Sequence, residues 1–577
     1  MRDRLAVGAA IIALTILSYF QFPGHTYLGS DTQIYVPMLE HIWDSSALTH
    51  DLVATKPHLA YTLYDEIAIA LRWITHSSFR AVLIGQQFIF RALEILGVYL
   101  LTASFPLARR MAMLVAAFFT LGATIVGPAV LIFEYEPVPR AFAVGLIFLA
   151  IGLAAQEHLM LADLAAALAF LYHPPTVWVF WLLYLWYVLR HRDYRDLWPL
   201  AIGIAVLFVS SRLQPGGAQH QDFFTRVSPE SEEMQRMRTS YNWISTWSAQ
   251  LIWQYILLWI VSLLAFWRIR PKTVRLFLLG MPAIGLLSIP LSYVLLEQLK
   301  WGLIPQFQPA RATLFITAFA VILAAAAGIR AAEAKRWIES AAWFVIVFAV
   351  PLSARVFNIS QRQFLVAAAL ATAAVVCVML LPSYRDSRAK NGDSLPVSHD
   401  LNWPAVNASP AWKQAGRPRF LRASFSNLAV IAIALAPFFV IPIIGRVRNY
   451  REPDLAAIDD LARFARSQTP KDAVFLFADA GTSGDPSVFR AESLRALYVD
   501  WKSGGQINYH EVSAQEWWQR WQAANQLRYQ PSALDGIEKL PIDFLVLQPK
   551  NRVPDRQPVY QSPQFVVYKL AHQGAGS

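Results

Sequence analysis

The sequence predicts an α-helical polytopic membrane protein with about thirteen transmembrane helices and a small C-terminal extracytoplasmic α/β domain. Of its 577 residues, 56% are hydrophobic and 15% are charged, whereas soluble domains average about 45–50% apolar and about 25% charged residues. Apolar runs long enough to cross hydrocarbon about 30 Å thick recur over roughly the first 445 residues. Beyond Arg446 these runs stop, and short strand-like and helix-like patterns replace them.

The first apolar run lies close to the N-terminus and continues to Phe20. Its exit, Gln21-Phe22-Pro23, has no small-residue cleavage pattern, so we expect a retained anchor and not a cleaved signal. The expected spans in order are 5–22, 80–103, 111–131, 140–155, 159–172, 175–190, 197–213, 250–267, 274–297, 311–329, 338–355, 363–382 and 427–445.

Basic residues beside short loops are retained on the cytoplasmic side of a membrane. With the N-terminus inside, Arg109, Arg110, Arg330 and Arg336 lie at cytoplasmic junctions, as does a polar connector at 383–424. An odd number of spans then places the C-terminus outside. We therefore expect a transmembrane domain over residues 1–446 and an extracytoplasmic domain over residues 447–577.

The patterns in the C-terminal domain predict a small α/β fold. Helical spacing covers 454–467 and 511–525, and buried strands are expected at 473–477, 544–547 and 565–570.

The net charge of +11 and the single cysteine narrow the function classes. Because basic residues gather at cytoplasmic junctions, the charge excess does not indicate a nucleic-acid partner, and we expect none. Cys377 lies in an apolar run and has no second cysteine to pair with, which excludes an intramolecular disulfide and a cysteine metal cluster.

Unusual polar residues gather on the outer face of this topology. Ionisable groups at a membrane are costly unless they are paired or wetted, so such a cluster predicts a functional site. A transport path would instead leave charges near mid-bilayer, where Arg91 and Glu94 are the main candidates, and their spacing predicts a structural pair. The outer-face candidates are Asp31, Asp51, Glu134, Glu136, Arg140, His173, Arg238 and Arg311, together with Arg490, Arg495, Asp500 and Lys502 in the C-terminal domain.

The arrangement resembles the GT-C superfamily of integral-membrane glycosyltransferases. The resemblance rests on Asp31 within Gly29-Ser30-Asp31-Thr32-Gln33-Ile34-Tyr35, on the segment from Glu134 to Arg140, and on His173-Pro174. It also rests on Phe489-Arg490 and on the string Arg495-Ala496-Leu497-Tyr498-Val499-Asp500-Trp501-Lys502.

The resemblance implies a bacterial inner-membrane enzyme that uses a polyprenyl-phosphate sugar donor. The acceptor would be the hydroxyl of a saccharide, a lipid or a protein. Members of the superfamily often have paired acids after the first span, whereas Thr32 follows Asp31 here. Asp51 or Glu134 would then supply the second acid.

Sugar transfer to a hydroxyl needs a carboxylate base, and the leaving phosphate needs fixed positive charge. Asp31 is the first candidate base, although an aspartate before a helix also serves as an N-cap. Asp51 is the second, with the same alternative. Glu134 and Glu136 are candidates to hold Mg²⁺ or Mn²⁺ or to orient the acceptor, and pairing with Arg140 explains them almost as well; the cofactor is left open.

The cationic candidates have both functional and structural interpretations. Arg140 suits a two-pronged phosphate contact or an interfacial anchor. Arg238 and Arg311 are phosphate candidates or routine snorkelling arginines, and His173 is a ligand or simply a turn residue.

In the outer domain, Arg490, Arg495, Asp500 and Lys502 would either cap the active site or form a surface salt-bridge network. Two other function classes fit the same sequence: a transporter or flippase of a lipid-linked envelope precursor, and a non-catalytic envelope assembly protein.

Overall fold

The computed structural model describes residues 2–20, 24–56, 62–128, 130–191, 197–213, 225–350, 366, 369–373, 375–376, 455–509, 511–524 and 529–570. The connector at 383–424, the predicted span at 427–445 and Cys377 lie outside these residues, and the span at 363–382 is described only in part. The predicted domain boundary at 446 also lies outside them.

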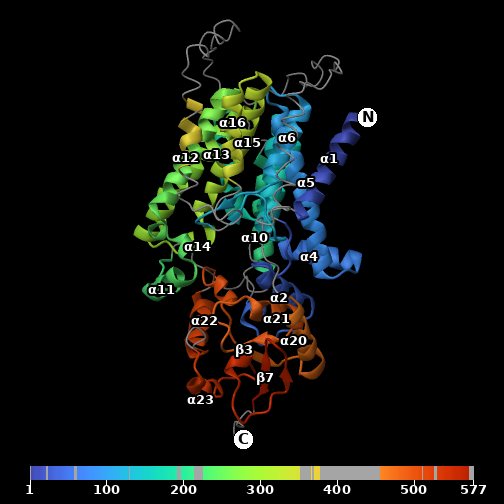
Figure 1. Ribbon diagram of the computed structural model, residues 1–577, viewed down its shortest axis with the longest axis vertical. Coiled ribbons are helices and arrows are strands. Elements are labelled where there is room, and N and C mark those ends of the chain that lie inside the picture. Colours follow the sequence, from blue (N-terminus) through green and yellow to red (C-terminus); the bar gives the residue numbers. More distant parts are fainter. Residues whose placement is uncertain are drawn as a thin grey trace.

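Apolar helices form an elongated bundle, with the N-terminus at one end and the C-terminal domain at the other (Figure 1). Within the described residues, four helices are long and apolar enough to cross a membrane: Phe79–Ala103, Ala249–Ile269, Arg275–Gln298 and Ile304–Glu333. Shorter apolar helices are Arg4–Phe20, Pro139–Ala155, Leu159–Tyr172, Trp198–Leu213 and Trp337–Ala349. The bundle elements are α1 (Arg2–Phe20), α5 (Phe79–Ala103), α6 (Arg109–Phe119), α7 (Pro139–Ala155), α8 (Leu159–Tyr172), α9 (Pro174–His191), α10 (Trp198–Leu213), α12 (Ala249–Ile269), α13 (Arg275–Ser292), η4 (Tyr293–Gln298), α15 (Thr313–Glu333) and α16 (Trp337–Ala349).

Helix α15 lies in the core of the bundle. Its sequence is apolar on all sides and rich in alanine, as expected of a helix surrounded by protein. Helices α5 and α7 approach closely through glycines: a Cβ on Gly97 would lie 2.3 Å from the carbonyl carbon of Phe148. Small residues at such contacts let two backbones pack directly.

The predicted third span, 111–131, is wrong in its second half. Helix α6 ends at Phe119, and the chain forms an antiparallel hairpin of β1 (Thr124–Ile125) and β2 (Val130–Leu131). Gly122 and Gly127 adopt positive φ angles of 69° and 96° in this hairpin, a conformation that glycine reaches readily. The apolar residues that suggested a span are instead buried inside the protein.

The segments expected as outer loops contain short helices. They are α2 (Thr32–Trp43), α3 (Leu52–Thr55), α4 (Tyr64–Thr75), α11 (Pro229–Arg238), η2 (Ser240–Asn242), η3 (Ile244–Thr246), α14 (Ile304–Phe307) and η5 (Pro309–Ala312).

The C-terminal domain is a five-stranded sheet with helices, as the sequence predicts. The strand order is β4-β3-β5-β7-β6; β4, β3 and β5 are parallel, and β7 and β6 are added antiparallel. Its elements are α20 (Leu455–Gln468), β3 (Val474–Phe477), α21 (Asp485–Ser493), β4 (Ala496–Leu497), η7 (Lys502–Gln506), α22 (Glu511–Ala524), η9 (Pro531–Ala533), α23 (Leu534–Ile537), β5 (Phe544–Leu547), η10 (Pro549–Asn551), β6 (Tyr560–Gln561) and β7 (Val566–Lys569).

Candidate functional site

Asp31 lies where the bundle meets the C-terminal domain, directly before α2. Its carboxylate accepts hydrogen bonds from Nη1 of Arg140 at 2.5 Å and from Nζ of Lys502 at 2.7 Å. Lys502 also donates to Oγ of Ser30 at 3.1 Å. Three segments that are far apart in the chain therefore meet at one carboxylate, which remains 31% exposed.

Burial tends to raise the pKa of Asp31, but the adjacent charges of Lys502 and Arg140 outweigh it and hold that pKa well below its usual range. The carboxylate is therefore ionised at neutral pH.

Arg140 connects Asp31 to a second carboxylate. Pro139 occupies the first turn of α7, where proline is well tolerated, and Arg140 follows it. Its Nε donates to Oε1 of Glu134 at 2.7 Å while Nη1 reaches Asp31. The planar guanidinium thus uses two edges at once, an arrangement that an ammonium group cannot reproduce.

Glu136 holds the loop that carries Asp31. It is fully buried and accepts hydrogen bonds from the backbone nitrogens of Ser30 at 2.5 Å and Asp31 at 2.7 Å, and from Oγ1 of Thr32 at 2.7 Å. Burial, and then the charge of Asp31, raise the pKa of Glu136. The Asp31 side chain makes no cap hydrogen bond to α2. Glu136 satisfies the amides at this helix start instead, and the Asp31 carboxylate is left facing the cations.

Lys502 is brought to Asp31 by a buried network centred on Arg490. The Arg490 guanidinium is fully buried and contacts Asp500 and Ser503 at 3.1 Å each. It also donates to the backbone oxygen of Gln33 in α2 at 3.1 Å. Arg490 therefore fastens the C-terminal domain to the helix that begins at Asp31, and its position is not that of a residue exposed to substrate.

Asp51 has a structural position. Its Oδ1 caps α3 by accepting from the nitrogens of Val53 at 2.9 Å and Ala54 at 3.1 Å, and its Oδ2 accepts from Leu497 N at 3.0 Å. Arg490 lies 3.7 Å away and Asp51 is fully buried. Because both oxygens are occupied, the geometry favours the capping alternative over the role of second base.

Arg495 and Asp500 also hold the C-terminal domain together. Arg495 donates to Thr469 Oγ1 at 3.2 Å and to the carbonyls of Thr469 and Arg466, so these contacts lie within the C-terminal domain. Asp500 is fully buried and accepts from Arg490 and from Ser503 N. Of the four residues expected to form a surface network, Arg490 and Asp500 form an ion pair, and this pair is buried.

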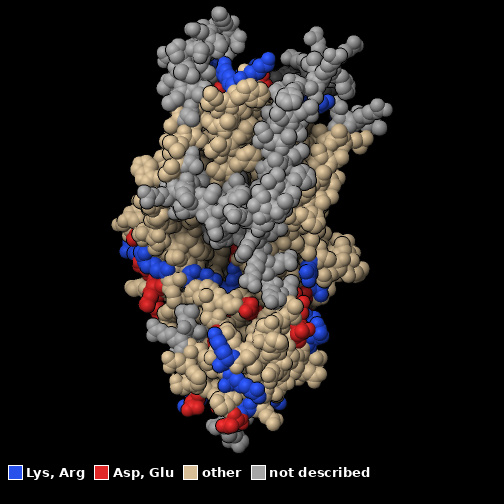
Figure 2. Space-filling view, viewed as in Figure 1, with Lys and Arg blue, Asp and Glu red and all other residues tan. Residues whose placement is uncertain are grey.

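The remaining basic candidates line the neighbourhood of the site. His173 pairs its Nδ1 with Thr176 Oγ1 at 2.8 Å, consistent with a turn role, and its Nε2 lies 3.5 Å from Nη1 of Arg311. Arg238 donates to the carbonyl of Trp501 at 2.9 Å and stacks on its ring at 4.8 Å. Figure 2 shows lysine and arginine side chains in a row at the level where the bundle meets the C-terminal domain.

Two tyrosines were not singled out from the sequence. Burial raises the pKa of Tyr35 and of Tyr509, and the charges of Asp31, Arg140 and Arg311 act on both. The signal for Tyr35 was its place four residues after Asp31, at the start of a helix. Nothing in the local sequence marks Tyr509, because only the docking of the C-terminal domain against the bundle brings it here.

The mid-bilayer pair expected between Arg91 and Glu94 does not form a hydrogen bond in the structure. Arg91 instead donates to the carbonyls of Gly24 at 2.5 Å and Glu134 at 2.6 Å, and to Ser18. Its contacts with Gly24 and Glu134 hold the two loops that precede α2 and α7.

Carboxylates near Asp31 already have partners. Arg140 pairs with both Asp31 and Glu134. The two carboxylate oxygens of Glu136 accept hydrogen bonds from the backbone nitrogens of Ser30 and Asp31. The described residues include no group of three or more histidine, cysteine or acidic side chains arranged to hold a metal ion. Oε2 of Glu134 is buried without a hydrogen-bond partner among the described residues. A Mg²⁺ or Mn²⁺ ion at Glu134 and Glu136 would gain only this one carboxylate oxygen unless it displaced the hydrogen bonds to Glu136, so the residues present do not fit such an ion.

A family model described as a domain of unknown function, DUF6798, matches residues 456–524. This segment contains Arg490, Asp500 and Lys502. No protein of curated function matches the chain. Among solved structures, the chain is similar to the crystal structure of ArnT from Cupriavidus metallidurans bound to undecaprenyl phosphate. The identity is 14% and the TM-score 0.47, over 98% of this chain and 97% of that one.

Proposed function

We propose that the protein is a GT-C-type membrane glycosyltransferase that moves a sugar from a polyprenyl-phosphate donor to an acceptor hydroxyl at the outer face of a bacterial inner membrane. The observation that carries the proposal is the Asp31 carboxylate held between Arg140 and Lys502 at the junction of bundle and outer domain. The resemblance of the Asp31, Glu134–Arg140 and His173 segments to GT-C enzymes supports it.

Asp31 is the proposed general base. The acceptor oxygen attacks the anomeric carbon, the bond from that carbon to the phosphate oxygen breaks, and the hydroxyl proton passes to Asp31. The sugar is transferred with inversion, an expectation taken from the GT-C resemblance. Polyprenyl phosphate then leaves carrying the negative charge.

Arg140 and Lys502 are the proposed phosphate ligands. Both are already paired with Asp31, which keeps its pKa low and its basicity weak. A bound phosphate would draw part of their hydrogen bonding away from Asp31, so the carboxylate becomes more basic only when the donor is present. The same cations then stabilise charge on the leaving group.

The test is transfer of labelled sugar from a polyprenyl-phosphate donor by the purified full chain in proteoliposomes. Asp31→Asn keeps the shape of the side chain but removes the base, and we expect turnover to fall by about 10²–10⁴-fold. Asp44→Asn, at an exposed surface pair with Lys471, is the matched control and should retain activity. Unchanged turnover in the Asp31 variant would remove the assignment.

A further inference from the structure

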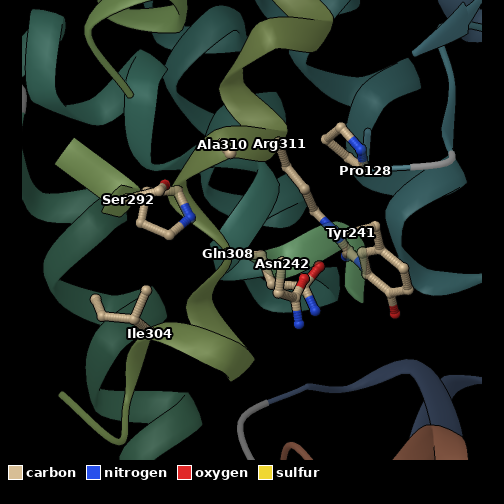
Figure 3. Close-up of a pocket in the computed structure, with 9 residues that line it drawn as sticks. Pro128, Tyr241, Asn242, Ser292, Ile304, Gln308, Ala310 and Arg311 are labelled. Carbon is tan, nitrogen blue, oxygen red and sulfur yellow. The ribbon is translucent and has the colours of Figure 1, made fainter. Parts of the chain in front are cut away.

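The hollow lined by Tyr241, Gln308 and Arg311 has room for about one water molecule (Figure 3), so it receives no larger ligand in this form of the protein. Helix α4 (Tyr64–Thr75), on the outside of the bundle, instead presents a face that is open to a partner.

The charged side chains of α4 are turned toward the protein. Asp65 is 3% exposed, and Glu66 is half-buried. Nη1 of Arg72 donates to Oε2 of Glu40 in α2 at 2.9 Å, and both side chains are largely buried. The charges of α4 are therefore withdrawn from the surroundings of the helix.

The outward face of α4 is apolar. Ala70, Trp73 and Ile74 are exposed, Trp73 by 69% and Ile74 by 64%, and their spacing places them on one face of the helix. Thr75 is exposed in the last turn, but its Oγ1 donates to the carbonyl of Leu71 at 2.7 Å. A helix covered by water on its outer side shows the opposite arrangement, with charged and polar residues outward.

A second exposed tryptophan lies beside α4. Trp43, the last residue of α2, is 42% exposed. The Arg72 guanidinium lies 4.7 Å from the centroid of the Trp43 ring and 4.3 Å from that of Phe79, the first residue of α5. Large apolar side chains exposed together on one side of a protein mark a contact surface.

The next helix fixes where α4 lies along the bundle. Helix α5 is long and apolar enough to cross a membrane, so its first turn lies at a membrane boundary. Only His76, Ser77 and Ser78 separate α4 from α5. His76 has a φ of 52°, and Ser78 caps α5 by accepting from the amide of Ala81 at 3.3 Å. Helix α4 therefore lies at the same boundary, where it projects sideways from the bundle near the C-terminal domain (Figure 1).

The chemistry of the exposed face identifies lipid as the partner. Tryptophan is enriched where headgroups meet acyl chains, and interfacial helices insert tryptophan and aliphatic side chains at that level. The face formed by Ala70, Trp73 and Ile74 contains no charged side chain with which a protein partner could pair. It also adjoins a spanning helix whose own apolar side chains are exposed, such as Ile89 at 57%.

We propose that α4 is an interfacial helix that lies on the membrane leaflet next to the C-terminal domain, with Trp73 and Ile74 inserted at the level of the headgroups. Through the pair of Arg72 and Glu40, the leaflet then sets the height of α2, which begins directly after Asp31. This placement goes beyond the proposed function and does not depend on the chemistry assigned to Asp31.

The experiment measures how deep position 74 lies in the bilayer. Cys377→Ala removes the single cysteine, and Ile74→Cys then takes a thiol-reactive NBD fluorophore on the full chain in phosphatidylcholine vesicles. The vesicles contain lipid with a nitroxide quencher either in the headgroup or deep in the acyl chain. The headgroup nitroxide should quench the fluorophore at position 74 at least about twofold more strongly than the chain nitroxide does.

Two matched variants in the same background calibrate the depth. Ile89→Cys, on the exposed side of the spanning helix α5, should be quenched more strongly by the chain nitroxide. Val559→Cys, which is 47% exposed in the C-terminal domain, should be quenched by neither lipid. If the Ile74 variant does not fold, Trp73→Cys repeats the measurement on the same face.

The proposal is overturned if the fluorophore at position 74 is quenched no more than the one at position 559. Quenching mainly by the chain nitroxide, as at position 89, would also overturn it, since α4 would then lie within the hydrocarbon. Blue-shifted emission without quenching by either lipid would place a protein surface, such as a second copy of the chain, on this face and would overturn it as well. Loss of the transfer activity assigned to Asp31 would leave these depths unchanged, so failure of the proposed function is distinguishable from failure of this inference.

Discussion

The Nζ of Lys502 lies 2.7 Å from Oδ1 of Asp31, although 471 residues separate them in the chain. One residue belongs to the loop after the first helix and the other to the C-terminal domain. The C-terminal domain therefore contributes a charge directly to the candidate site and does not merely cover it.

Replacing Lys502 by methionine should move the acid limb of the pH–activity profile. The paired cations hold the pKa of Asp31 well below its ordinary value of 3.8. The stabilisation of the charged form is therefore present above pH 3.8 and is lost only as the pH falls through the lowered pKa. Without Lys502 that pKa rises, so kcat/KM should begin to fall at a higher pH than in the wild type.

Lys471→Met, at an exposed pair with Asp44, is the control and should leave the pH–activity profile unchanged. A profile of the Lys502 variant that coincides with the wild type would show that Lys502 does not act on the titrating group.

Arg140→Lys tests whether two-pronged geometry matters. An ammonium group carries the same charge but cannot bond to Glu134 and Asp31 through separate edges. We expect kcat/KM to fall at least tenfold while the protein still assembles in the membrane. Steady-state kinetics with the polyprenyl-phosphate donor measure this. Wild-type kinetics in the lysine variant would show that Arg140 acts only through its positive charge.

Glu136→Gln should loosen the loop before α2. The amide keeps one acceptor oxygen but loses the second, so at least one of the hydrogen bonds from Ser30, Asp31 and Thr32 is lost. Leaving a buried donor unsatisfied costs about 1–3 kcal/mol, which thermal unfolding in detergent would detect. Because Asp31 is then poorly placed, kcat should fall more than the affinity for donor. A fall in donor affinity with kcat unchanged would argue against a positioning role.

Arg490→Met should detach the C-terminal domain from the bundle. The substitution leaves Asp500 and Asp51 buried without their cation, and breaking a buried ion pair in this way costs about 3–5 kcal/mol. Proteolysis near the start of the C-terminal domain and loss of turnover are the expected signs. Arg463→Met, whose side chain is 75% exposed, is the control. Protease resistance equal to that of the wild type would show that the domain docks through other contacts.

The helices of the bundle and the strands of the C-terminal domain could be predicted because each follows from local patterning. Apolar runs mark α5, α12 and α15, and short apolar strands mark β3 and β5. The prediction was wrong at residues 120–131, where an equally apolar segment forms a buried hairpin. Hydrophobicity reports burial and does not say whether lipid or protein covers a residue.

The sequence by itself determined which residue types are available to the candidate site: an aspartate after the first apolar helix, a Glu-rich loop before Arg140, and basic residues in the C-terminal domain. Only the tertiary structure decided their roles. Asp31 and Asp51 both precede helices, yet only the buried Asp51 side chain caps its helix. At Asp31 the backbone amides donate to Glu136 instead, so the Asp31 carboxylate is available to pair with Arg140 and Lys502. Such a division depends on contacts between segments more than 100 residues apart, which the local sequence does not encode. The charge on a side chain is fixed by its chemistry, but its partners are fixed by how the chain packs.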